Sequence, residues 1–272
     1  MEKTADLIAE CAHLLDKSEQ SLVPVGPLTE RFPELSVEQA YQVQMRNVER
    51  RTDRGDTVVG HKVGLTSKPM QRMLGVPEPD FGHLFQSMYY ESGTVVDYPL
   101  IQPKVEPELA FILKHDLDSV KTTVRDVLQA TEYVVPAIEV IDSRVADWKI
   151  KLPDTVADNA SSGCFVLGDL YTSIDKVNLG TIGGVMKMNG SVVQTGAGAA
   201  VLGHPAVSVA WLANKLNSLG TKLKAGDVVL SGAVSAAVTF HPGDSVSVSF
   251  GRLGTVSATR ADNESKTGAR AQ

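Results

Sequence analysis

Two stretches at the start of the chain carry apolar residues at helical spacing. In residues 1–17, three leucines fall on one face of a helix. In the second stretch, Ser36 stands three residues before Gln39, which is the signature of a capping box, and the helical pattern continues to Gly55. We therefore expect the first 55 residues to form a helical segment of two helices, interrupted where Pro24 and Pro27 break the chain.

From Thr57 onward, β-branched runs alternate with Gly, Pro and Asp, a texture typical of strands and turns. Asn189-Gly190 lies between two such runs and predicts a tight hairpin. Residues 245–250 alternate strictly between serine and an apolar residue, as a half-buried strand does. The expected strands are 58–63, 94–96, 105–114, 134–141, 163–167, 184–188, 191–194, 227–231 and 245–250.

Two more helices are expected inside this β-rich part. A short one begins at Thr123, and a longer one covers residues 205–219, where His204 is more typical of a helix N-terminus than of a catalyst. The pattern as a whole predicts an α+β protein. Its expected parts are a helical N-terminal segment (1–55), a β-rich catalytic domain (56–260) and a polar, disordered tail (261–272).

Charge and cysteine usage narrow the class of protein. The 272 residues contain 26 Lys plus Arg and 32 Asp plus Glu, so the formal charge is −6. That balance argues against nucleic acid or an anionic membrane as a partner. No apolar run approaches the roughly 20 residues of a membrane span. Cys11 and Cys164 are far apart in the sequence, which argues against a disulfide framework. The N-terminus lacks the features of a signal peptide, so we expect a cytoplasmic protein.

Three glutamates stand in otherwise apolar strands. Glu106 and Glu108 are two residues apart, so both side chains point to the same face of their strand, about 7 Å apart. Glu139 lies alone in a second apolar strand. Burying grouped carboxylates is costly unless a cation joins them, and Mg²⁺ or Mn²⁺ takes such ligands. The alternative is a solvated sheet face for Glu106 and Glu108, with Glu139 paired to Lys or Arg.

Both strands also contain a proline, Pro107 in the first and Pro136 in the second. Proline cannot donate a hydrogen bond to a neighbouring strand, so each predicts a sheet edge or a bulge. Bulges are frequent beside active sites.

Other polar residues are ambiguous from pattern alone. Lys62 lies in a strand flanked by glycines, where a surface lysine is the common case. Asp80, in Pro-Asp-Phe-Gly, has the sequence of an ordinary turn. The polar stretch 158–163 is either a turn or a substrate loop. The motifs GxSxG, HExxH and the P-loop are all missing from the sequence.

Taken together, the motifs resemble the fumarylacetoacetate hydrolase superfamily, and within it the hydratase/decarboxylase family of aromatic meta-cleavage degradation. The resemblance runs from about residue 35 to 260 and implies a mixed-sheet β roll preceded by helices. The segments that carry it are GHKVGLTS (60–67), LGVPEPDFGHLF (74–85), PKVEPELAFIL (103–113), PAIEVIDSR (136–144), DTVADNASSG (154–163) and GAGAAVLGHPAVSVAWLANKL (196–216).

The resemblance also implies roles for individual residues. Lys62 matches the family's active-site lysine, and Asp80 matches the acid of its hydratases. The substrate-binding residues are expected to be Leu65, Asn159 and Ser161, and the metal triad Glu106, Glu108 and Glu139, holding Mg²⁺ or Mn²⁺. A small-molecule 2-hydroxydienoate as substrate, a homo-oligomer and association between sister hydratase and decarboxylase are implied as well.

Three functions follow from this family. The first is metal-dependent hydration of 2-hydroxypenta-2,4-dienoate to 4-hydroxy-2-oxopentanoate. The second is decarboxylation of 4-oxalocrotonate, which needs no base for water; the family's decarboxylases lack an acid where Asp80 stands here, which favours hydration. The third is a non-catalytic scaffold that binds the decarboxylase, an alternative disfavoured by the presence of Lys62, Asp80 and the three glutamates.

Overall fold

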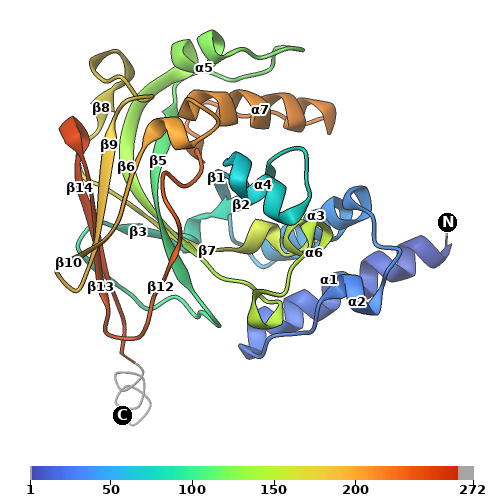
Figure 1. The fold of residues 1–272 in the computed structure, drawn as a ribbon. Coiled ribbons are helices and arrows are strands. Elements are labelled where there is room, and N and C mark those ends of the chain that lie inside the picture. Colours follow the sequence, from blue (N-terminus) through green and yellow to red (C-terminus); the bar gives the residue numbers. More distant parts are fainter. Residues whose placement is uncertain (1, 263–272) are drawn as a thin grey trace.

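The structure is a computed structural model and describes residues 2–262. The greater part of the tail expected to be disordered, 263–272, lies outside the described residues. Of the described helices, none has the length and apolar character that a membrane span requires. The observed class is α+β, with helices gathered at the N-terminal end and two mixed β-sheets beyond them (Figure 1), as the pattern predicts.

The N-terminal helices form where the spacing places them. Helix α1 covers Glu2–Ser21 and extends past the expected end, whereas the short α2, Leu28–Arg31, was not predicted. Helix α3 covers Val37–Asp53 and begins with the expected capping box, in which Ser36 and Gln39 each accept the other's backbone N–H.

The larger sheet positions the site. In the described part of the chain it has nine strands, with the path β2-β1-β11-β5-β6-β7-β3 and with β12 and β8 pairing beside β5 and β6. The strands β5 and β6 are the longest and occupy its centre (Figure 1). The nine strands are β1 Val58–Gly64, β2 Asp80–Phe85, β3 Tyr89–Glu91, β5 Lys104–Leu113, β6 Thr131–Ile141, β7 Ser162–Leu167, β8 Thr172–Ser173, β11 Val228–Leu230 and β12 Val238–Thr239.

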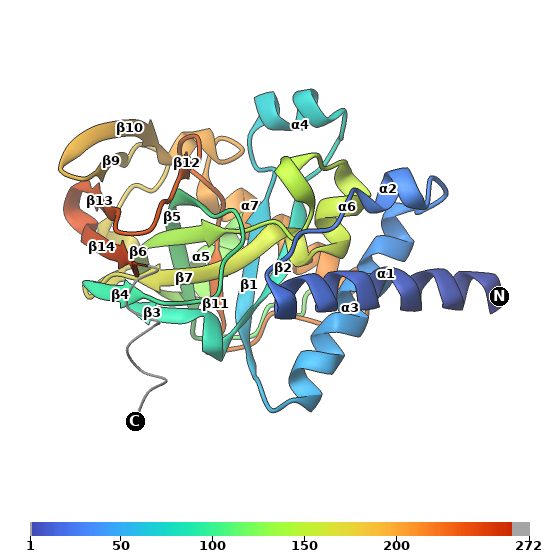
Figure 2. The ribbon, with the colours of Figure 1, turned by 90° about the horizontal axis from the view of Figure 1, so that it is seen from below.

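The smaller sheet lies at the opposite end of the molecule from α1–α3 (Figure 2) and packs on β6 through β13 and β14. The hairpin predicted at Asn189-Gly190 is confirmed, since both residues have positive φ (51° and 81°) and join adjacent strands. The sheet has the order β10-β9-β13-β14-β4. Its strands are β4 Thr94–Val96, β9 Gly183–Met188, β10 Ser191–Ala197, β13 Ser245–Phe250 and β14 Gly254–Arg260.

Four further α-helices in the described part of the chain flank the sheets. Two were expected: α5, Val124–Ala130, and α7, Pro205–Ser218, where the Nδ1 atom of His204 accepts the Ala206 N–H as a cap. The other two, α4 (Lys68–Leu74) and α6 (Leu152–Ala157), were not predicted. Both are single short helices without a repeating apolar face, so periodicity gives no signal for them.

The prolines mark neither sheet edges nor bulges, so that prediction is wrong: β5 and β6 lie inside the sheet, and their ladders keep register at both prolines. The Pro107 carbonyl accepts the N–H of Val234, between the end of β11 and the start of β12. The Pro136 carbonyl accepts the N–H of Gly168, between β7 and β8. In an antiparallel strand the N and C=O of one residue face the same neighbour. Each proline nitrogen therefore faces a gap in the adjacent ladder, where a donor is not needed.

Candidate active site and metal centre

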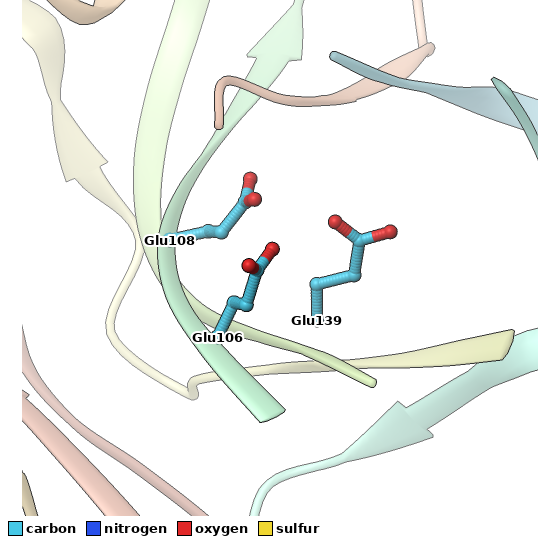
Figure 3. A group of neighbouring side chains, drawn as sticks. All are labelled: Glu106, Glu108 and Glu139. Atoms are coloured by element: carbon cyan, nitrogen blue, oxygen red, sulfur yellow. The ribbon is translucent and has the colours of Figure 1, made fainter. Parts of the chain in front are cut away.

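Three carboxylates meet on one face of the β5–β6 pair (Figure 3). Glu106 lies opposite Glu139 in the strand register, and Glu108 follows on the same face of β5. One oxygen from each of the three carboxylates lies within 4.8 Å of the others. Glu108 and Glu139 are each only 1% exposed, so the alternative of a solvated sheet face is wrong for Glu108.

Burial and mutual repulsion dominate the electrostatics of this cluster. Burial, and then the charge of Glu139, raises the pKa of Glu106 to about 7. The pKa of Glu108 lies well above its ordinary value for the same reasons, with Glu106 adding to the repulsion. The pKa of Glu139 is also raised by burial, although Lys62 opposes the shift. Raised pKa values of this kind show that the carboxylates have too little positive charge around them to offset burial and mutual repulsion.

The oxygens of the cluster fit a hard divalent cation. Both carboxylate oxygens of Glu139 are buried, and within residues 2–262 Oε1 has only the ammonium of Lys62 beside it, whereas Oε2 has no hydrogen-bond partner. Glu108 uses only Oε2, which accepts the backbone N–H of Gly232 at 2.8 Å. Buried lone pairs without donors are costly, and Mg²⁺, Mn²⁺ or Ca²⁺ uses such oxygens as ligands. The cluster could therefore hold a metal ion.

Lys62 lies on β1, beside this cluster. Its Nζ atom is 3.2 Å from Oε1 of Glu139, and the lysine is 4% exposed. Burial alone would lower the pKa of Lys62, but the negative charges of Glu139 and Asp80 raise it above its ordinary value. The lysine is therefore a buried ammonium ion held by carboxylates, rather than the surface lysine that its sequence context suggested.

Asp80 is the first residue of β2 and not part of a turn, so the turn interpretation is wrong. It lies opposite Gly64 in register and is 2% exposed. A Cβ at Gly64 would lie 2.2 Å from Oδ1 of Asp80, so glycine at that position makes room for the carboxylate. Burial raises the pKa of Asp80, and Lys62 and the Thr155 hydroxyl oppose that shift.

A cavity of about 540 Å³ brings most of the predicted residues together. Lys62, Asp80 and Glu106 line it, together with Leu65 and Ser161. The rest of its wall is largely apolar, including Met70, Trp148, Ile150, Ala200 and Val234.

Asn159 is not brought to this cavity. Its side-chain Nδ2 donates to the carbonyl of His83 at 2.9 Å, and its Oδ1 accepts the His83 N–H at 2.7 Å. Both ends of the amide are thus used to clamp the turn before β7 onto β2. The structure places Asn159 as a support of the cavity wall rather than as part of its lining.

Sequence reasoning missed two contributors to the site. Thr155 donates a hydrogen bond to Asp80 at 3.4 Å, and Gly232, at φ 109°, presents its N–H to Glu108. Thr155 lies within the segment 154–163 that carries the family resemblance, which is the signal that could have found it. Gly232 follows a predicted strand, but a glycine after a strand is too common to single out.

Comparisons with known proteins agree with this architecture. A curated 2-keto-4-pentenoate hydratase from Paraburkholderia xenovorans (strain LB400) is 44% identical over 256 residues, covering 94% of this chain and 95% of the relative. A 2-hydroxypent-2,4-dienoate hydratase from Pseudomonas putida is 51% identical over 222 residues, covering 81% of this chain and 99% of the relative.

A solved structure is similarly close. The 4-oxalocrotonate decarboxylase from Pseudomonas putida G7, complexed with magnesium and adipate, superposes with a TM-score of 0.91 at 41% identity and covers 94% of this chain and 97% of that one. The family model described as fumarylacetoacetate (FAA) hydrolase C-terminal matches residues 46–260. With that match over most of its length, the chain belongs to the fumarylacetoacetate hydrolase family.

Proposed function

We propose that this chain is a metal-dependent hydratase that converts 2-hydroxypenta-2,4-dienoate to 4-hydroxy-2-oxopentanoate in a meta-cleavage pathway. Curated relatives named as hydratases of this kind are 44–51% identical to it. The observation that carries the proposal is the joint placement of Lys62 and Asp80 on one cavity wall beside three carboxylates. Such a site combines an ammonium ion, an acid–base group and a cation site around one small-molecule cavity.

Glu106, Glu108 and Glu139 would hold the ion, for which we propose Mg²⁺ or Mn²⁺. When bound, such an ion supplies Lewis-acid stabilisation of negative charge on the carboxylate and 2-oxygen of the substrate. The unpartnered Oε2 of Glu139 and the raised pKa of all three glutamates support this assignment.

Lys62 supplies a fixed positive charge where the dienol becomes an enolate. Its pKa is raised by its carboxylate neighbours, so it stays protonated and stabilises negative charge on the 2-oxygen as that hydroxyl loses its proton. The net change transfers the proton lost by the 2-hydroxyl to C5, which gives the conjugated 2-oxo-3-enoate. The proton transfer at C5 therefore depends on the enolate that Lys62 stabilises.

Asp80 serves the second half of the reaction. Its Oδ1 has no hydrogen-bond partner in the described part of the chain, although Asp80 lies on the cavity wall. That oxygen takes a proton from water as the water oxygen bonds to C4, and Asp80 then delivers this proton to C3, which gives 4-hydroxy-2-oxopentanoate and returns Asp80 to its ionised form. Leu65 and Ser161 line the same cavity and would contact the substrate.

Decarboxylation of 4-oxalocrotonate is the second candidate, favoured by the superposition on that decarboxylase at 41% identity. Loss of CO₂ requires a place for a second carboxylate, and Lys104 on the cavity wall could face one. It requires no base for water, so a buried Asp80 with a free oxygen favours hydration instead.

Incubating the pure protein and Mg²⁺ with each substrate separates these functions. We expect hydration of hydroxypentadienoate and little CO₂ from 4-oxalocrotonate. Release of CO₂ without hydration would replace the first proposal with the second. Calorimetry that detects no binding of Mg²⁺ or Mn²⁺, together with inactivity on both substrates, would instead support the scaffold alternative.

We also propose that the enzyme is a homo-oligomer and that it associates with the sister decarboxylase, as the family resemblance implies. Sedimentation velocity tests both proposals. The protein alone should sediment faster than a 272-residue monomer, and faster still after the decarboxylase is added. A monomer that is unaffected by the decarboxylase would contradict both.

A further inference from the structure

A line of buried hydroxyls leads away from Asp80 on the side opposite the unpartnered oxygen. The Thr155 hydroxyl donates to Oδ2 of Asp80 at 3.4 Å and lies 3.3 Å from the hydroxyl of Ser161. The Ser161 hydroxyl in turn donates to Oδ2 of Asp158 at 3.4 Å. All four residues are buried, with exposed fractions of 2–4%.

Arg144 anchors the far end of this line. Its guanidinium forms a buried ion pair with Asp158, and its backbone N–H donates to Oδ2 of Asp158 at 3.0 Å. It also donates to the backbone carbonyls of Asp158 and Ser162, at 2.6 and 2.7 Å. Burial raises the pKa of Asp158 to about 6 against the opposing charge of Arg144, so this carboxyl is ionised at pH 7.5 and can only accept hydrogen bonds.

The anchor decides the direction of the hydrogen bonds. A hydroxyl has one proton to donate. Because Asp158 only accepts hydrogen bonds, the Ser161 hydroxyl donates its hydrogen bond to Asp158. Its oxygen lone pairs then face Thr155. Thr155 can then donate to Asp80 while Asp80 is ionised. When Asp80 is protonated on Oδ2 at low pH, it donates to the Thr155 oxygen, and the Thr155 hydroxyl then donates to Ser161 instead.

The backbone is strained where it places Ser161. Asn159, Ala160 and Ser161 have φ values of 52°, 50° and 53°, three consecutive non-glycine residues in the left-handed region. Such a conformation costs roughly 1–2 kcal/mol per residue. The turn is fixed by the clamp from Asn159 to β2, where a Cβ at Gly82 would lie 2.3 Å from the Asn159 carbonyl oxygen. Strain of this kind persists where the surrounding structure enforces it, often at functional sites.

We propose that Thr155 is a positioning residue for Asp80, with Ser161, Asp158 and Arg144 fixing the direction in which it donates. Thr155 holds Oδ2 of the ionised acid and leaves Oδ1 as the oxygen that takes a proton from water during turnover. The acid that forms at low pH carries its proton on Oδ2, from which it donates to Thr155. Because it assigns a partner to Asp80, the inference rests on the proposed hydratase function.

The other charged or titratable groups around Asp80 do not differ between variants of this line. They are Lys62 on β1, Tyr41 on α3, Glu106 on β5 and Glu139 on β6. A change in the protonation of Asp80 between variants therefore reflects the loss of a hydroxyl group at Thr155 or Ser161.

The test measures hydration against pH in the Mg²⁺-saturated enzyme, with the acidic limb assigned to Asp80 by its disappearance in Asp80→Asn. Thr155→Val removes the donor to the carboxylate, so we expect kcat to fall about 10- to 100-fold and the limb to move to higher pH. Thr155→Ser should restore both. KM should change little, because the Thr155 hydroxyl is directed at Asp80 rather than at substrate.

Ser161→Ala gives a shift of opposite sign. It leaves Thr155 able to donate to ionised Asp80 but removes the acceptor needed when Asp80 is protonated, so the limb should move to lower pH. Alanine tolerates the backbone conformation, since Ala160 already adopts it at φ 50°. Thr131→Val is the matched control: it removes an equally buried hydroxyl that donates to the Val127 carbonyl, and it should leave the limb in place.

A limb unmoved in both variants, or moved in the same direction by both, would overturn the inference. If circular dichroism shows that Thr155→Val does not fold, Ser161→Ala alone tests the inference. An acidic limb that stays in place or moves to higher pH in Ser161→Ala would then reject it. Failure of the proposed function looks different, because the wild-type enzyme itself would then not hydrate hydroxypentadienoate.

Discussion

The two faces of the β1–β2 pair bury ionisable side chains with opposite results. On the cavity face, Lys62 and Asp80 are 4% and 2% exposed and lie among other charges. On the opposite face, His61 and His83 lie directly across from each other, with ring centroids 4.8 Å apart and exposed fractions of 7% and 5%. Strand alternation separates the two pairs, because adjacent residues point to opposite faces.

The difference lies in the available partners. The pKa of Lys62 is raised because carboxylates offset its burial, so the charge is kept. Burial lowers the pKa of His83 to about 4, and burial together with His83 lowers that of His61 well below its ordinary value. Their Nδ1 atoms have no partner within the described residues. The same sheet therefore holds a charged lysine on one face and neutral imidazoles on the other.

The largest effect is expected where the cavity face loses a proposed metal ligand. Glu108→Gln removes one of three charges for the cation and should reduce Mg²⁺-dependent hydration by on the order of 10³-fold or more, while the fold is retained. Calorimetric Mg²⁺ titration and steady-state rates measure the two changes, and circular dichroism checks the fold. Full activity of this variant, or of the wild type in EDTA, would refute the metal triad.

Asp80→Asn should separate the two halves of the reaction. An amide cannot take a proton from water, so hydration should fall about 10²–10⁴-fold, whereas proton exchange at C5 should survive in part. Lys62→Ala should lose both, because Lys62 acts on the shared enolate. NMR detection of deuterium incorporation beside the hydration rate makes the distinction. Near wild-type hydration by Asp80→Asn would remove the best argument for hydratase over decarboxylase.

Removing the metal should change stability in a pH-dependent way. The folded pKa of Glu106, about 7, exceeds its ordinary value of 4.5, so the metal-free folded state holds more protons than the unfolded state between those values. Its stability therefore falls as pH rises across this range. Mg²⁺ at 100 times its Kd should add about 2.7 kcal/mol, or roughly 5–10 °C in Tm. The gain from millimolar Mg²⁺ should be larger at pH 8 than at pH 6; equal melting curves with EDTA and Mg²⁺ would contradict it.

These faces also show how far sequence reasoning reaches. The capping box at Ser36, the hairpin at Asn189-Gly190 and the alternation of β13 are encoded by neighbouring residues, and each was predicted. Asp80 was assigned to a turn from pattern, because Pro79 and Gly82 flank it. Its burial depends on the missing side chain of Gly64, sixteen residues earlier in the chain, which only strand pairing brings opposite.

The partners of the site residues could not be predicted from the sequence either. Strand alternation correctly puts Glu106 and Glu108 on one face, but the approach of Glu139 depends on the register of β5 against β6. The left-handed turn at residues 159–161 contains no glycine, the residue that would indicate such a turn in the sequence. Contacts of this kind are set by tertiary packing, which overrides local propensity.

The smallest effect on activity is expected on the histidine face. His83→Gln replaces one neutral polar side chain with another, away from the cavity, so hydration should stay within about twofold of wild type. Its effect should appear in stability at low pH.

The folded pKa of His83 is about 4, below its ordinary value of 6.5, so the unfolded state binds the extra proton between these values and wild-type stability falls as pH drops. The variant lacks that contribution, so its stability difference from wild type should shift in its favour by on the order of 1 kcal/mol between pH 7.5 and pH 5. Urea unfolding at both pH values measures this shift, and taking the difference from wild type cancels the opposing titration of the glutamates. A hydration defect as large as that of Asp80→Asn would show that the two faces are not independent.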